Sequence, residues 1–153
     1  MYIPNLNINY WAIVISMVVY FLIGWLWYSP RLFGKIWMKE MHFTGDVRPG
    51  PKDMAKSMIL VLFGCFLTSF VLTHALHVWR PSVWWGINGI PDSPSYGFGL
   101  MAATFTWIGY YVPLFLTSVA FEKMSWKLFA VNAGYHLVGL QVIAQILAYW
   151  WNI

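Results

Sequence analysis

Residues 57–79 of this chain read SMILVLFGCFLTSFVLTHALHVW and contain no Asp, Glu, Lys or Arg. Three further stretches, 9–28, 100–121 and 128–151, are also apolar and free of these four residue types. A hydrocarbon core about 30 Å thick is crossed by roughly 20 helical residues, each rising about 1.5 Å. All four stretches reach that length. Each is therefore predicted to be a membrane-spanning helix.

The composition predicts one membrane domain over residues 1–153. The chain is 60% hydrophobic and only 9% charged, whereas soluble domains carry about 25% charged residues. No segment between the four stretches is long or apolar enough to bury a second core. The predicted fold class is all-α: an integral membrane four-helix bundle. Cys65 is the single cysteine, so an intramolecular disulfide and a Cys-rich metal site are both excluded.

Basic residues predict the orientation, because short loops rich in Lys and Arg stay in the cytoplasm. Of the nine Lys and Arg residues, eight lie in segments 29–56 and 122–127, and the ninth is Arg80. We therefore expect these two segments in the cytoplasm and both termini on the outer side. The net charge of +4 follows from this bias, so it does not predict a nucleic-acid partner.

A short helix is predicted on the cytoplasmic membrane surface after the first span. Arg31, Lys35 and Lys39 recur every four residues and form one basic stripe. Such a stripe favours contact with lipid headgroups. The membrane lipid is thus one expected partner.

Prolines and a serine predict where the other helices begin, end or bend. Pro30 should end the first helix, and Pro51 suits the first turn of the next, which would then begin before it enters the bilayer. Pro113 lies inside the third span and should kink it. The short connection before Ser125, a predicted N-cap, makes the last two spans antiparallel neighbours.

The loop at residues 80–99 is irregular without being polar, since it combines prolines and glycines with the pair Trp84 and Trp85. We expect this pair to contact the outer membrane face or a partner protein.

His74 and His77 lie three residues apart near the outer end of the second span, on one helical face. This spacing is compatible with a shared metal ion. A polar anchor at the interface is the alternative, because a third ligand is missing: His136 lies at a different depth of the membrane.

The fourth span is the most polar. Asn132 and His136 share one face, while Gln141 and Gln145 share nearly the opposite one. Three roles remain open for them: hydrogen bonding between helices, lining a pocket for a polar ligand or solute, and proton handling by His136. Small residues four apart, such as Gly99 with Ala103, allow close helix packing within the bundle or between copies.

Two groups of residues resemble a known family. The first is Asn9-Tyr-Trp11 followed by GWLWYSPRLFGKIW at 24–37; the second is Glu122, SWKL at 125–128, Asn132-x-Gly134-Tyr135 and Trp150. Together they resemble the bacterial membrane-protein family called domain of unknown function 1761. The resemblance implies a four-span protein of the bacterial inner membrane, which would place the termini in the periplasm. It implies no catalytic residues.

Motifs for a phosphate-binding loop, a zinc protease or a serine hydrolase are absent from the sequence. We therefore predict a non-enzymatic membrane protein, either a homo-oligomer or an accessory subunit that contacts other membrane proteins. No cofactor is implied, although a lipid, quinone or pigment is compatible with such a subunit. The alternatives are a solute channel or transporter formed by oligomerisation and, with less support, an enzyme acting on lipids or quinones.

Overall fold

The computed structural model describes residues 8–43, 50–80, 83 and 95–150. Within these ranges the protein is helical and contains no strand. The elements are α1 (Tyr10–Trp27), α2 (Gly34–Glu40), α3 (Pro51–Val78), α5 (Ser95–Thr106), the π-helical turn η1 (Trp107–Tyr111), α6 (Val112–Phe121) and α7 (Trp126–Trp150). Four helical segments are long and apolar enough to cross a membrane: α1, α3, residues 96–121 and α7. The predicted all-α, multi-pass membrane fold is confirmed.

Most helix ends lie where the sequence predicts them. The Asn9 side chain accepts hydrogen bonds from the backbone N–H groups of Trp11 (3.1 Å) and Ala12 (3.2 Å), which caps α1. Helix α3 begins at Pro51, six residues before its uncharged stretch, as expected. Ser125 Oγ accepts from the backbone N–H of Leu128 (3.1 Å), so the predicted cap of α7 is formed.

The third span is interrupted just before Pro113, but by a π-helical turn rather than a simple kink. The turn covers Trp107–Tyr111 and leads into α6. Pro113 has no N–H to donate to the backbone one turn earlier, so the normal hydrogen-bond pattern cannot continue there. A π turn is one of the ways a helix accommodates such a break. The sequence located the interruption without specifying its form.

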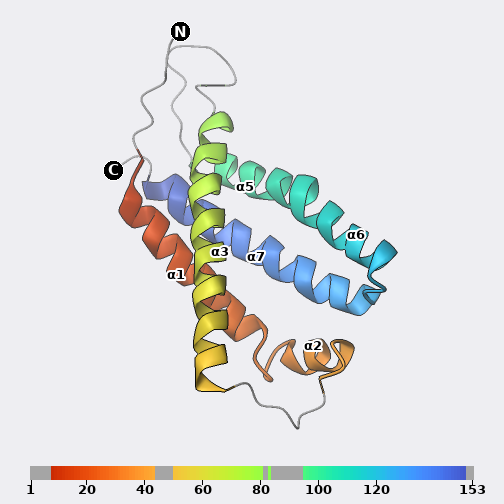
Figure 1. Cartoon of the computed structure of the whole chain (residues 1–153). Helices are drawn as coiled ribbons and strands as arrows, with labels where there is room; N and C mark the ends of the chain where they lie inside the picture. Colours follow the sequence, from red (N-terminus) through yellow and green to blue (C-terminus); the bar gives the residue numbers. More distant parts are fainter. Residues whose placement is uncertain (1–7, 44–49, 81–82, 84–94, 151–153) are drawn as a thin grey trace.

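Helix α7 is the central element of the bundle. It packs against α1, α3 and α5, and in Figure 1 it lies between α1 and the α5–α6 segment. In the most apolar part of α7, 44% of the residues are buried, whereas the corresponding share is 17–28% in the other three spans. Helices α6 and α7 are antiparallel neighbours, as predicted. Helix α1 begins and α7 ends at one end of the bundle, and α2 lies at the other, where α3 begins (Figure 1). We call the latter the α2 end.

Glycines on α1 and α7 face aromatic rings of the opposite helix. An added Cβ at Gly139 would overlap the Tyr20 ring, and one at Gly24 would lie 3.0 Å from the Tyr135 hydroxyl. Gly134 meets Trp27 in the same way, at 3.2 Å. Bulky rings therefore enter space that only glycine leaves open, and this fixes the register of the two helices.

Helices α5 and α7 use alanines for close contact. The four alanines of this interface are fully buried: Ala102, Ala103, Ala144 and Ala148. Gly99 lies against Gln145. Gly99 and Ala103 are thus buried within one chain, and a contact between copies through small residues stays a prediction.

Candidate functional site

The imidazole of His136 lies within a cluster of aromatic rings. Its Nδ1 shares a hydrogen bond with the hydroxyl of Tyr20 on α1. In the described part of the chain, four rings from four elements surround it, at centroid distances of 4.3 Å (Tyr111), 4.7 Å (Tyr135), 5.6 Å (Phe115) and 6.1 Å (Tyr20). The α1–α7 packing positions Tyr20 directly, since that ring occupies the space above Gly139.

A cavity of about 650 Å³ opens beside this cluster, between α1, α3 and α7, with Trp37 of α2 in its wall. We call it the aromatic cavity. Its other walls include Met54, Val61 and Gly64 of α3. Its rings are Tyr20, Phe21, Trp25, Tyr28, Trp37 and Tyr135, with His136 beside them. Ligand sites have this character: about 300–1,000 Å³, mostly apolar, with a few placed polar groups.

The polar residues predicted on the fourth span lie on two separate sides of α7. Asn132 and His136 face α1, where Asn132 Oδ1 accepts a hydrogen bond from the Tyr28 hydroxyl (3.1 Å). On the α5 side, Gln141 donates to Thr104 Oγ1 (2.9 Å). Gln145 also faces α5 and donates to the Tyr96 carbonyl oxygen (3.3 Å). The structure therefore brings Asn132 and His136 together near the cavity and keeps the two glutamines apart from them.

The histidines predicted on α3 have contacts of their own. His74 shares a hydrogen bond with the Phe70 carbonyl oxygen through Nδ1 (2.8 Å), and its ring packs on the Phe70 ring at 4.7 Å. Over the described ranges, no group of three His, Cys, Asp or Glu side chains could hold a metal ion. A metal shared by His74 and His77 stays a prediction.

The predicted surface residues fall into two groups. Arg31, Lys35 and Lys39 are exposed at the α2 end, before and within α2. Their contact with lipid headgroups stays a prediction. Trp84 and Trp85 lie outside the described residues.

The junction between α1 and α2 is attached to the first half of α7. Trp27 Nε1–H donates to the Val131 carbonyl oxygen (3.0 Å), and Tyr28 bonds to Asn132. The chain then turns so tightly that an added Cβ at Gly34 would overlap the Tyr28 carbonyl oxygen. The two stretches that resemble a known family, far apart in sequence, are therefore in direct contact.

A comparison against protein families covers both stretches. The model described as "Protein of unknown function (DUF1761)" matches residues 11–148, which include both stretches. The chain belongs to the DUF1761 family. No curated protein and no solved structure matches it. In this DUF1761 chain, the family's sequence features thus build one wall of the aromatic cavity and its attachment to α7.

Several residues of the site could not be recognised in advance, above all Tyr20, Tyr111 and Tyr135. One signal was present in the sequence. Tyr28 and Tyr111 each stand two residues before a proline, in helices that cross the membrane in the same direction. In the folded DUF1761 chain both tyrosines contact polar side chains of α7: Tyr28 bonds to Asn132, and the Tyr111 ring packs on His136.

Proposed function

We propose that this DUF1761 protein is a non-enzymatic membrane protein that binds an amphiphile, with the ligand's flat, hydrogen-bond-accepting head in the aromatic cavity. The observation that carries this proposal is the position of His136, the imidazole in the wall of a mostly apolar, ring-lined cavity. A few placed polar groups in such a wall orient a ligand and select its head.

The hydrogen bonding of His136 supports an acceptor on the ligand. With the Tyr20 hydroxyl as donor to Nδ1, the neutral imidazole carries its proton on Nε2. Nε2 makes no hydrogen bond to any residue that the structure describes. It is also not one of the buried side-chain atoms that lack a partner, so it is accessible at the surface of the chain. Because His136 lines the aromatic cavity, the proposal has this Nε2–H donate to a carbonyl oxygen of the ligand there.

The ring-lined walls support a planar head. Trp25, Trp37 and Tyr28 come from α1, α2 and the segment between them, so their rings reach the cavity from more than one direction. Aromatic side chains pack on planar groups in stacked or edge-on arrangements worth about 0.5–1.5 kcal/mol beyond area burial. A quinone-like ring joins both features, flatness and carbonyl acceptors.

Such a protein would act as an accessory subunit or a self-associating carrier in the bacterial inner membrane, with the α2 end in the cytoplasm. Basic residues support this orientation, since Arg31, Lys35 and Lys39 are exposed at the α2 end. Cysteine labelling from each side of the membrane tests it: residue 35, as Lys35→Cys with Cys65→Ser, should react only from the cytoplasm. Reaction from the periplasm would reverse the orientation.

The alternative, a solute path along α7, has less support. The polar side chains proposed to line it lie on two sides of the helix and are bonded to different neighbours. One chain therefore does not offer them to a common path. A path between copies would need Gln141 to leave its bond with Thr104.

Gly64 allows the binding proposal to be tested without disturbing the packing. It lines the aromatic cavity, and an added Cβ there would meet no atom within 4 Å. Gly64→Leu should therefore fill cavity space while keeping the helix, where leucine is more favourable than glycine. Gly97→Leu is the matched control, because Gly97 also has open space and lines neither cavity.

The measurement is mass spectrometry of amphiphiles extracted from protein purified in mild detergent from its own membrane. Wild type and Gly97→Leu should retain the same quinone-like compound, and Gly64→Leu should retain about tenfold less, because a tenfold loss needs only about 1.4 kcal/mol. Equal retention by all three proteins, or no compound in wild type, would contradict the proposal.

A further inference from the structure

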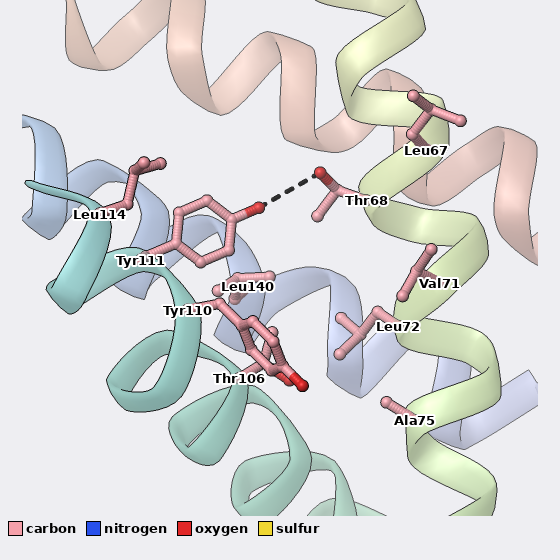
Figure 2. A pocket seen from close by; sticks show the side chains of 10 residues that line it. All are labelled: Leu67, Thr68, Val71, Leu72, Ala75, Thr106, Tyr110, Tyr111, Leu114 and Leu140. Carbon is pink, nitrogen blue, oxygen red and sulfur yellow. Dashed lines mark hydrogen bonds between the residues drawn. The ribbon is translucent and has the colours of Figure 1, made fainter.

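A second cavity, of about 470 Å³, lies between α3 and the α5–η1–α6 segment. We call it the aliphatic cavity. Its lining includes Thr68, Thr106, Tyr110 and Tyr111, and Figure 2 shows its side chains reaching inward from both sides. The other six of the ten lining side chains are aliphatic. They are Leu67, Val71, Leu72, Ala75, Leu114 and Leu140.

Thr68 belongs to the walls of both cavities. Its Oγ1 shares a hydrogen bond of 3.3 Å with the Tyr111 hydroxyl. Figure 2 shows this bond connecting Tyr111 of η1 to Thr68 of α3. The same Tyr111 ring packs on His136 at 4.3 Å. One pair of side chains thus stands between the aliphatic cavity and the polar group of the aromatic cavity.

This partition is weak compared with a packed helix interface. A distance of 3.3 Å lies beyond the usual range for a hydroxyl–hydroxyl bond, and both partners can rotate about side-chain bonds. The backbone that carries Tyr111 is the π turn, held to α7 by a hydrogen bond from Trp107 Nε1–H to the Ala133 carbonyl oxygen (2.8 Å). The ring can therefore turn while its backbone stays fixed.

We infer that the two cavities form one site, in which the ligand's single apolar chain passes between Thr68 and Tyr111 and lies in the aliphatic cavity. This inference rests on the proposed function, because the head must lie at His136. The walls favour this division: the aromatic cavity is lined by six aromatic rings and the His136 imidazole, whereas six aliphatic side chains line the aliphatic cavity, beside two threonines and two tyrosines. The ligand class is a planar carbonyl head with one long hydrocarbon or isoprenoid chain.

Val71→Phe tests the chain-binding part alone. Val71 lines the aliphatic cavity and is 61% exposed, so a larger side chain can enter the cavity without displacing buried residues. The matched control is Val78→Phe on the same helix, where the valine is 54% exposed and lines neither cavity. Equal thermal unfolding midpoints would show that both variants remain folded.

Two probes separate the head from the chain: a methyl-substituted benzoquinone and the same ring bearing a ten-carbon alkyl chain. Dissociation constants come from quenching of tryptophan fluorescence, since Trp25 and Trp37 line the aromatic cavity. Val71→Phe should weaken the alkylated probe about tenfold, because several methylenes lose burial. It should leave the chainless probe unchanged, and Val78→Phe should change neither.

The failures are distinguishable. If wild type does not bind the chainless ring, the proposed function fails. If the ring binds but Val71→Phe leaves the alkylated probe unaffected, this inference is overturned while the head site stands, and the aliphatic cavity belongs to a bilayer lipid chain instead. An isoprenoid-substituted ring run in parallel distinguishes the two chain types.

Discussion

The contact between α1 and α7 is closed, whereas the space between α3 and the η1–α6 segment is open. On the closed side Tyr20 fills the space above Gly139 and bonds to His136. On the open side the cavity walls are joined by the bond between Thr68 and Tyr111 at 3.3 Å. The two regions therefore have different roles in the proposal. The closed side positions the His136 imidazole, and the open side admits the ligand's hydrocarbon chain.

The largest effect should come from filling the closed side. Gly139→Ala should lower the free energy of unfolding by about 1–3 kcal/mol, the usual cost of overpacking, because the new Cβ overlaps the Tyr20 ring. The control away from the α1–α7 contact is Gly64→Ala in the wall of the aromatic cavity, where an added Cβ meets no atom within 4 Å; it should leave stability unchanged or raise it, since alanine favours helix. Thermal unfolding followed by circular dichroism in detergent compares the two. If both variants were destabilised equally, the claim that the α1–α7 contact is more closely packed than the cavity wall would be wrong.

A smaller effect should follow from deleting one hydroxyl on each side. Tyr20→Phe leaves His136 Nδ1 without its partner and should cost about 1–3 kcal/mol. Within membrane bundles such bonds average less, about 0.6 kcal/mol, so the lower end is expected. Tyr110→Phe removes a hydroxyl from a side chain that is 74% exposed and should change the unfolding midpoint little. If Tyr110→Phe lowered the free energy of unfolding as much as Tyr20→Phe, polar contacts would also stabilise the open side.

Much of the fold could be predicted because the membrane makes it a local property of the sequence. Uninterrupted apolar stretches specify the spans, and Pro51 and Ser125 specify helix starts through backbone groups within one turn. The π turn before Pro113 could not be specified, because several local rearrangements satisfy the same missing N–H.

The site was less predictable because its contacts are distant in sequence. The polarity of α7 drew attention to His136, but the partner that orients it, Tyr20, is 116 residues away. The sequence of α1 alone does not predict which of its rings will form a hydrogen bond with the His136 imidazole. Likewise, the role of Gly139 as the space for the Tyr20 ring depends on how two helices pack, which the sequence of one helix does not specify.

The central claim is that His136 holds a ligand head in the aromatic cavity. The most direct test is a high-resolution density map of the protein purified from its native membrane in mild detergent. We expect flat density in the aromatic cavity within hydrogen-bond distance of His136 Nε2, continuing past Thr68 into the aliphatic cavity. A well-ordered map in which the aromatic cavity is closed by its own side chains, or holds only water, would contradict it.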